Sequence, residues 1–102
     1  MADKAIYVVL RADLKMPPGK AIAQACHAVL ALGQPDEGII ALRAEDMAHL
    51  ELIQQAAVKS GIECIGITDA GRTVFKEPTV TCIALGPVVR GTFPMLQNCR
   101  LY

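Results

Sequence analysis

Four short runs of apolar residues, rich in Val and Ile, recur along the chain. Runs of this length and composition, bounded by turn-forming residues, are typical of β-strands. The first run is apolar up to its terminal arginine, which is typical of a strand covered on both faces. The predicted strands are Ile6–Arg11, Gly38–Leu42, Ile62–Ile67 and Thr79–Leu85.

Two segments with apolar residues at helical spacing separate the first three runs. The first extends from about Pro18, a favourable first helical residue, to Gly33, a favourable stop. The second extends from about Glu45 to Ser60 and is followed by Gly61. A period of about 100° per residue places one apolar stripe on each helix. The stripes are Ile22, Cys26, Val29, Leu30 and Gly33 in the first helix, and Met47, Leu50, Ile53 and Ala57 in the second.

The order of these elements predicts an α/β fold. Strand–helix–strand crossovers join parallel strands, so we expect the first three strands to be parallel. The connection Thr68–Pro78 has no helical period, which predicts that the fourth strand is antiparallel. The expected architecture is therefore three layers, α/β/α, with a mixed four-stranded sheet. The segment Val88–Tyr102 contains Gly91 and Pro94, and we expect a short helix or turn there, followed by an extended tail.

Composition narrows the class of protein. The 102 residues, of which 53% are hydrophobic, suit one domain with its own core, spanning 1–102. No apolar run is long enough for a membrane span, and the first residues lack a signal-peptide pattern. Four cysteines without a Cys-x-x-Cys pair favour buried free thiols in the cytoplasm, with a disulfide framework or a zinc site as alternatives. A metal site is improbable because the two histidines are far apart.

Polar residues at the predicted strand ends indicate a ligand site. In open α/β sheets, ligands bind beyond the carboxyl ends of the parallel strands. Lys20 follows the first strand, the segment Asp69–Thr73 follows the third, and an antiparallel fourth strand begins near Thr81 at the same edge. Lys20, Gln24 and His27 are spaced by four and three residues, so they share one side of the first helix, opposite its apolar stripe. We therefore expect these segments to converge.

Each candidate also has an ordinary structural interpretation. Lys20 in the first helical turn opposes the helix dipole at a small cost, which can mark function, but it can equally be a solvated lysine. His27 can be a solvent-facing histidine, and Asp69 can simply form a turn with the glycine that follows. Thr81 suits a strand whether or not it is functional, on one face with Ile83 and Leu85.

Charge is balanced overall but unevenly distributed. Ten basic and ten acidic residues cancel, so the strong positive charge typical of a nucleic-acid binder is missing. Between positions 36 and 63 there are six acids and two bases, a net charge of −4, and the remainder has eight bases and four acids, a net charge of +4. The basic part contains Lys15, Lys20, Arg72 and Lys76 of the proposed rim, which suits a ligand bearing phosphate.

These segments together resemble the peptidyl-tRNA hydrolase 2 family. The similarity lies in the first strand and helix, in the Asp-Ala-Gly-Arg-Thr loop, in the last strand and in the ending. The matching segments are Arg11–Met16, Gly19–Lys20, Ala23–Ala28, Asp69–Thr73, Thr81–Pro87 and Leu101–Tyr102. The loop combined with the Lys/Gln/His helix is a fairly specific signature.

The resemblance implies hydrolysis of the ester that joins a peptide to the 3′ ribose of tRNA, usually by a homodimer, without a metal or organic cofactor. It implies catalytic roles for four residues, with two more beside them, and the basic rim adds two candidates for substrate binding. The implied catalytic residues are Lys20, Asp69, Thr73 and Thr81, and the substrate-binding candidates are Gln24, His27, Lys15 and Arg72.

Two alternatives remain open from the sequence. The connection Leu32–Glu37 is shorter than is usual in the family, and the chain lacks a basic surplus. Both features are also typical of a non-catalytic module that binds a tRNA end, a nucleotide or another anion. Hydrolysis of a smaller acyl ester is a third possibility, distinguished by weak dependence on salt.

Overall fold

The computed structural model describes residues 3–33 and 36–102. Four strands, β1 (Lys4–Arg11), β2 (Gly38–Ala44), β3 (Cys64–Asp69) and β4 (Thr79–Val89), form one sheet in the order β2-β1-β4-β3. β1 and β2 are parallel, whereas β4 pairs antiparallel with both β1 and β3. The mixed four-stranded sheet is thus confirmed. The prediction of three mutually paired parallel strands is wrong. β4 lies between β1 and β3, so β1 and β2 form the single parallel pair of this sheet.

Burial explains this strand order. Residues Ala5–Leu10 of β1 and Thr81–Gly86 of β4 are buried, whereas the edge strands β2 and β3 contain exposed or half-buried positions. The two runs that are apolar on both faces occupy the centre of the sheet, where both faces are covered. The predicted two-sided burial of the first strand is confirmed.

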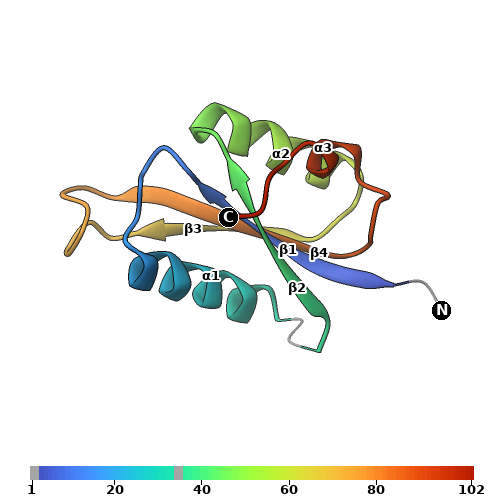
Figure 1. The fold of residues 1–102 in the computed structure, drawn as a ribbon, viewed down its shortest axis with the longest axis horizontal. Helices are drawn as coiled ribbons and strands as arrows, with labels where there is room; N and C mark the ends of the chain where they lie inside the picture. The colour runs from blue at the N-terminus through green and yellow to red at the C-terminus, as the bar shows by residue number, and fades with distance from the viewer. Residues whose placement is uncertain (1–2, 34–35) are drawn as a thin grey trace.

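Helices cover both faces of the sheet, as Figure 1 shows. Helix α1 (Pro18–Leu32) lies on one face, and α2 (Met47–Lys59) and the short α3 (Pro94–Gln97) lie on the other. Each face has its own cluster of buried apolar side chains. The short helix α3 is followed by a tail, as predicted for the end of the chain. The tail pairs with the edge of β2 through a bridge between Leu42 and Leu101, which was not predicted.

The orientation of α1 differs from the prediction. Ile22 and Leu30 of the predicted stripe are 65% and 74% exposed, and Cys26 is also exposed. The residues of this helix that are buried are Ala21, Gln24, Ala28 and Val29. No charged residue follows Lys20 within α1, so apolar residues occur on all its sides and periodicity could not select the inner one.

The other expectations have mixed outcomes. The stripe of α2 is confirmed for Leu50, Ile53 and Ala57, which are buried. Burial of all four thiols is wrong, because Cys26 is exposed. The short connection between α1 and β2 includes residues 34–35, which lie outside the described residues. Within 3–33 and 36–102, no helix has the length and apolar character needed to cross a membrane.

Candidate active site

An ion pair joins the start of α1 to the end of β3. Lys20 lies in the first turn of α1, and Asp69 is the last residue of β3. The Lys20 ammonium donates a hydrogen bond to Oδ1 of Asp69, although 49 positions separate the two residues. Their side chains are only 16% and 10% exposed. The convergence predicted for the strand ends is therefore present for these two groups. Figure 1 shows the start of α1 near the end of β3, at one end of the sheet.

The turn after β3 holds the Asp69 carboxylate in place. Its Oδ2 accepts a hydrogen bond from the backbone N–H of Gly71 at 2.9 Å. Gly71 has φ of +81°, and a Cβ there would collide with the backbone of Glu77. The loop therefore requires glycine at this position. The bond from Lys20 is the larger influence on Asp69 and the Gly71 N–H the next, and together they lower the pKa of the carboxyl group.

Two residues of the β3–β4 loop complete the surroundings of Lys20. The Thr73 hydroxyl accepts a hydrogen bond from the ammonium at 3.3 Å, which leaves the hydroxyl proton free to be donated elsewhere. The Lys20 Nζ also lies 5.9 Å from the centroid of the Phe75 ring, within cation–π range. Sequence reasoning missed Phe75, and its position two residues after the Asp69–Thr73 motif is the signal that could have drawn attention to it.

Thr81 is near this site but buried beneath it. Its hydroxyl donates to Oε1 of Gln24 at 2.5 Å, and both side chains face the interface between α1 and the sheet. The β3–β4 register changes here, since Ile67 pairs with Cys82 and Thr68 pairs with Val80.

Thr81 is thus the extra residue of a β-bulge, which directs its side chain toward α1. The expectation that Thr81 shares a face with Ile83 and Leu85 is wrong for this reason. Those two residues belong to the core cluster on the α2 side.

The remaining candidates lie outside the ion pair. His27 is exposed on α1, seven residues or about 10 Å along the helix from Lys20. Lys15 and Arg72 are exposed, and Lys15 adopts a φ of +49°, unusual for a residue other than glycine. In the described part of the chain, the side chains of these three residues make no hydrogen bond with Lys20 or Asp69. The expected placement of Gln24 on the helix side opposite the core is wrong, because Gln24 is buried.

Arg11 begins one of the segments that carry the family resemblance, but the sequence assigned it no role. Its guanidinium binds both carboxylate oxygens of Asp13, at 3.1 and 2.8 Å, and donates to the Val80 carbonyl at 3.0 Å. The last residue of β1 is thereby attached to the segment of β4 that precedes Thr81. A charged residue at the end of an otherwise apolar run was the available signal.

The cysteines do not form a reactive or metal-binding site. Burial raises the pKa of the Cys64 thiol to about 11 and also raises those of Cys82 and Cys99, so these thiols are protonated near neutral pH. Over residues 3–33 and 36–102, no group of three or more His, Cys, Asp or Glu side chains is placed to hold a metal ion.

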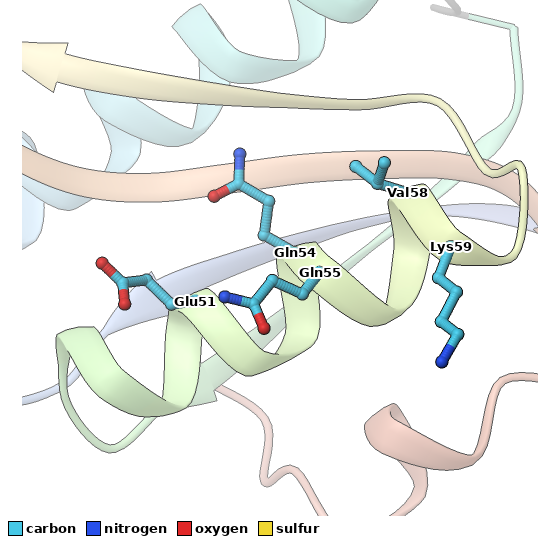
Figure 2. Close-up of a pocket in the computed structure, with 5 residues that line it drawn as sticks. All are labelled: Glu51, Gln54, Gln55, Val58 and Lys59. Carbon is cyan, nitrogen blue, oxygen red and sulfur yellow. The ribbon is translucent and has the colours of Figure 1, made fainter.

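A surface hollow on α2 is separate from this chemistry. Figure 2 shows that its lining comes from one helix, with side chains that diverge from one another. None of the predicted site residues contributes to it. The lining residues are Glu51, Gln54, Gln55, Val58 and Lys59.

Comparison with known proteins identifies the family. The family model described as peptidyl-tRNA hydrolase PTH2 matches residues 5–93. A peptidyl-tRNA hydrolase of Aeropyrum pernix is 33% identical over 99 aligned residues, covering 78% of this chain and 80% of that protein. A peptidyl-tRNA hydrolase of Haloquadratum walsbyi is 37% identical over 93 residues, covering 78% and 82%.

Two further similarities agree in family or in fold. A probable peptidyl-tRNA hydrolase 2 of Schizosaccharomyces pombe is 35% identical over 97 residues, covering 80% of this chain and 47% of that protein. A solved structure of a protein of unknown function from Agrobacterium tumefaciens has a TM-score of 0.70 at 16% identity, with 100% and 99% of the two chains covered, and supports the fold alone. The matched segment includes the Lys20–Asp69 pair and the loop that follows Asp69. The chain therefore belongs to the peptidyl-tRNA hydrolase PTH2 family.

Proposed function

We propose that this chain hydrolyses the ester bond of peptidyl-tRNA, releasing the peptide and free tRNA, with the Lys20–Asp69 pair at the reacting centre. The observation that carries this proposal is the ion pair itself, formed between distant segments of a chain that belongs to the family. Both charged groups are mostly buried yet partly accessible, so a substrate can reach them. An ammonium and a carboxylate fixed side by side suit a reaction in which water attacks a carbonyl and negative charge develops on oxygen.

Lys20 and Asp69 act on different parts of the hydrolysis reaction. The water oxygen forms a bond to the carbonyl carbon, and the bond from that carbon to the ribose oxygen breaks. The proton lost by the water is balanced by the proton that the ribose hydroxyl gains. The Lys20 ammonium stabilises the oxyanion, as preorganised positive charge does most effectively in a partly desolvated site. The Asp69 carboxylate orients the water rather than deprotonating it, because its lowered pKa makes it a weak base.

The other candidate residues support these two. Thr73 holds the ammonium and keeps its own hydroxyl proton available for the substrate. Thr81 and Gln24 act as positioning residues, since their buried hydrogen bond links β4 to the helix that bears Lys20.

The exposed candidates have a different role. His27, Lys15 and Arg72 bind the substrate from the rim, where two cations attract phosphate. The functional groups required by the reaction come from the chain itself, and we assign no metal or organic cofactor.

Turnover of a defined peptidyl-tRNA tests the proposal. We expect Asp69→Asn and Lys20→Ala each to lower kcat/KM by about 10²-fold or more, since each removes a charged group that acts on the transition state. Asp3→Asn is the matched control, because Asp3 also forms an ion pair, with Arg90, but on a more exposed surface. Near-normal rates in both site variants contradict the proposal.

Binding without cleavage identifies the non-catalytic alternative. If the unmodified chain binds peptidyl-tRNA and leaves the ester intact, the chain is a binding module. Salt distinguishes the third possibility, because a substrate rich in phosphate makes kcat/KM fall steeply with added salt, whereas a small acyl ester does not.

The proposed assembly is a homodimer acting in the cytoplasm, where translation produces peptidyl-tRNA. Its support is the exposed apolar side of α1, on which Ile22 and Leu30 lie with Cys26 between them. A hollow of about 300 Å³ beside them is lined entirely by apolar surface and extends to Ile39 of β2. Exposed apolar patches of this kind mark protein contacts more often than free surface.

A further inference from the structure

The ring of Phe75 lies beside the Lys20 ammonium but does not take part in the bond-making and bond-breaking steps of ester hydrolysis. Phe75 belongs to the β3–β4 loop, and the Lys20 Nζ lies over its ring, 5.9 Å from the centroid. The Phe75 side chain is half-buried, whereas Val74 and Lys76 on either side of it are exposed. The loop therefore turns this apolar side chain inward while its two neighbours face the solvent.

Two features of the loop hold the ring in this place. Phe75 packs against the cluster of buried side chains on the α1 side of the sheet, which includes Met16 and Ala21. The loop is also closed at its base, because Gly71 lies so near the backbone of Glu77 that an added Cβ would collide with it. The ring is thus a fixed surface beside the ammonium.

The Lys20 ammonium is mostly buried but has few oxygen partners. It has three N–H groups. Within residues 3–33 and 36–102, its oxygen partners are Asp69 and, at 3.3 Å, Thr73. The distance to Thr73 is slightly beyond the ordinary range for an N–H···O bond. The Lys20 side chain is only 16% exposed, and moving an ammonium out of water is costly unless other groups compensate. Burial of this charge therefore favours a further attractive contact.

The face of an aromatic ring supplies such an attraction without accepting a conventional hydrogen bond. The ring quadrupole attracts a cation over its face within about 6 Å, and the attraction is larger where water is excluded. An oxygen ligand in the same place would accept the remaining N–H of Lys20. The ring instead leaves that N–H available to the carbonyl oxygen of the ester, where negative charge develops during the attack of water.

We infer that Phe75 is a positioning residue for ester hydrolysis, whose ring face fixes the Lys20 ammonium beside Asp69 and leaves one N–H of that ammonium for the oxyanion. This inference deepens the proposed function and rests on it for the kinetic consequence. It assigns an electrostatic role to a side chain that also packs against the core. Leucine in place of Phe75 would retain apolar packing but would not attract the charge.

Ring fluorination separates the electrostatic role of Phe75 from its packing role. Each fluorine withdraws electron density from the ring face and weakens its attraction for a cation, while the size of the ring changes little. In the full-length chain, Phe75 is replaced by phenylalanines that carry one, two or three ring fluorines. With peptidyl-tRNA we expect kcat to fall stepwise, to about fivefold below the unmodified value with three fluorines, and KM to stay unchanged.

Phe93 is the matched control, because it is the other phenylalanine of the chain and is buried in the cluster on the α2 side. The same fluorinated series at Phe93 should leave kcat nearly unchanged. Phe75→Leu should lose about as much kcat as the ring with three fluorines. A constant kcat along the Phe75 series, or full activity of Phe75→Leu, overturns the inference. A rise in KM at constant kcat also overturns it, because the ring would then contact the substrate rather than position Lys20.

The mobility of Lys20 distinguishes failure of this inference from failure of the proposed function. Nitrogen relaxation NMR of the lysine side chains gives an order parameter for each ammonium. The value for Lys20 should fall stepwise along the Phe75 series and stay constant along the Phe93 series, with exposed Lys59 as the mobile reference. If the chain cleaves no peptidyl-tRNA but this decline is found, the proposed hydrolysis fails and the positioning of Lys20 by Phe75 remains. A constant order parameter for Lys20 along the Phe75 series overturns the inference whatever the activity.

Discussion

The hydroxyl of Thr81 donates a hydrogen bond to Oε1 of Gln24 at 2.5 Å, in the interface between β4 and α1. This bond exists because the β-bulge at Thr81 directs its side chain toward the helix. Gln24 lies one helical turn after Lys20, so the bond fixes the rotation of the segment that carries the ammonium. The geometry of the Lys20–Asp69 pair therefore depends on two residues that substrate does not need to touch.

Thr81→Val should destabilise the chain and reduce activity together. Valine has nearly the same shape but leaves the buried Oε1 of Gln24 without a donor, at a cost of roughly 1–3 kcal/mol in the free energy of unfolding. Urea unfolding measures the loss. Thr81→Ser retains the hydroxyl and should recover most of it. Thr79→Val is the control, because the Thr79 hydroxyl makes an exposed local bond to the Glu77 carbonyl. Equal effects at both positions would show that the Gln24 bond is unimportant.

Lys20 and Asp69 should act as one unit in catalysis. Because each charge positions the other, removing one should remove most of the benefit of both. We expect the double variant Lys20→Ala/Asp69→Asn to lose about as much kcat/KM as either single variant, near 10²-fold. Steady-state kinetics on all four chains measures this coupling. Losses that multiply in the double variant would show that the two residues act independently.

The Asp69 carboxylate should remain ionised at pH values where an ordinary aspartate is half protonated. The Lys20 bond, followed by the Gly71 N–H, lowers its pKa in the folded state. The resulting stabilisation is present above the unfolded pKa of about 3.9 and is lost as the pH falls through the lower folded value.

Lys20→Met should therefore raise the pKa of Asp69, as followed by NMR titration of the carboxyl carbon. Asp13 is the internal control, because Arg11 lowers its pKa and Lys20 does not contribute. An unshifted Asp69 titration in Lys20→Met would contradict the role assigned to the ion pair.

Gly71→Ala should disrupt the loop more than an ordinary glycine substitution does. Alanine at φ of +81° carries the penalty of a left-handed conformation, about 1 kcal/mol, and here its Cβ also meets the Glu77 backbone. Gly61→Ala is the matched control, with φ of +74° and open space around the added Cβ. Thermal unfolding and kcat/KM should both decline further for Gly71→Ala, and equal values for the two variants would mean that the loop relaxes without consequence.

Leu30→Glu should convert the proposed homodimer into a monomer. A carboxylate on the exposed apolar side of α1 would be buried without a partner in the interface, which is strongly unfavourable. Sedimentation velocity over a range of concentrations measures the change. Val58→Glu is the control, since Val58 is a similarly exposed apolar residue on α2, at 65%. A chain that is monomeric before substitution, or a dimer that survives Leu30→Glu, contradicts this assignment of the interface.

Local pattern predicted the elements of this fold, with boundaries within two residues of those observed except at the end of β4, which continues to Val89 rather than stopping at Leu85. Pro18 and Gly33 bounded α1 because their backbone preferences act locally, and β1 was identified as doubly covered because its run is apolar throughout. The position of β4 between β1 and β3 was not predictable, since strand order depends on contacts between distant segments. The inner side of α1 was mispredicted for a related reason, namely that small apolar residues surround the helix.

The candidate site shows the same division. The residue types and spacing of Lys20, Gln24 and the Asp69–Thr73 loop, with the family resemblance they carry, were sufficient to predict ester hydrolysis and the convergence of Lys20 with Asp69. The pairing of Thr81 with Gln24 and the ring of Phe75 near the ammonium were decided only in three dimensions. Chain periodicity determines which residues can share a face, but a one-residue bulge or a tail that returns to an edge strand determines which faces meet.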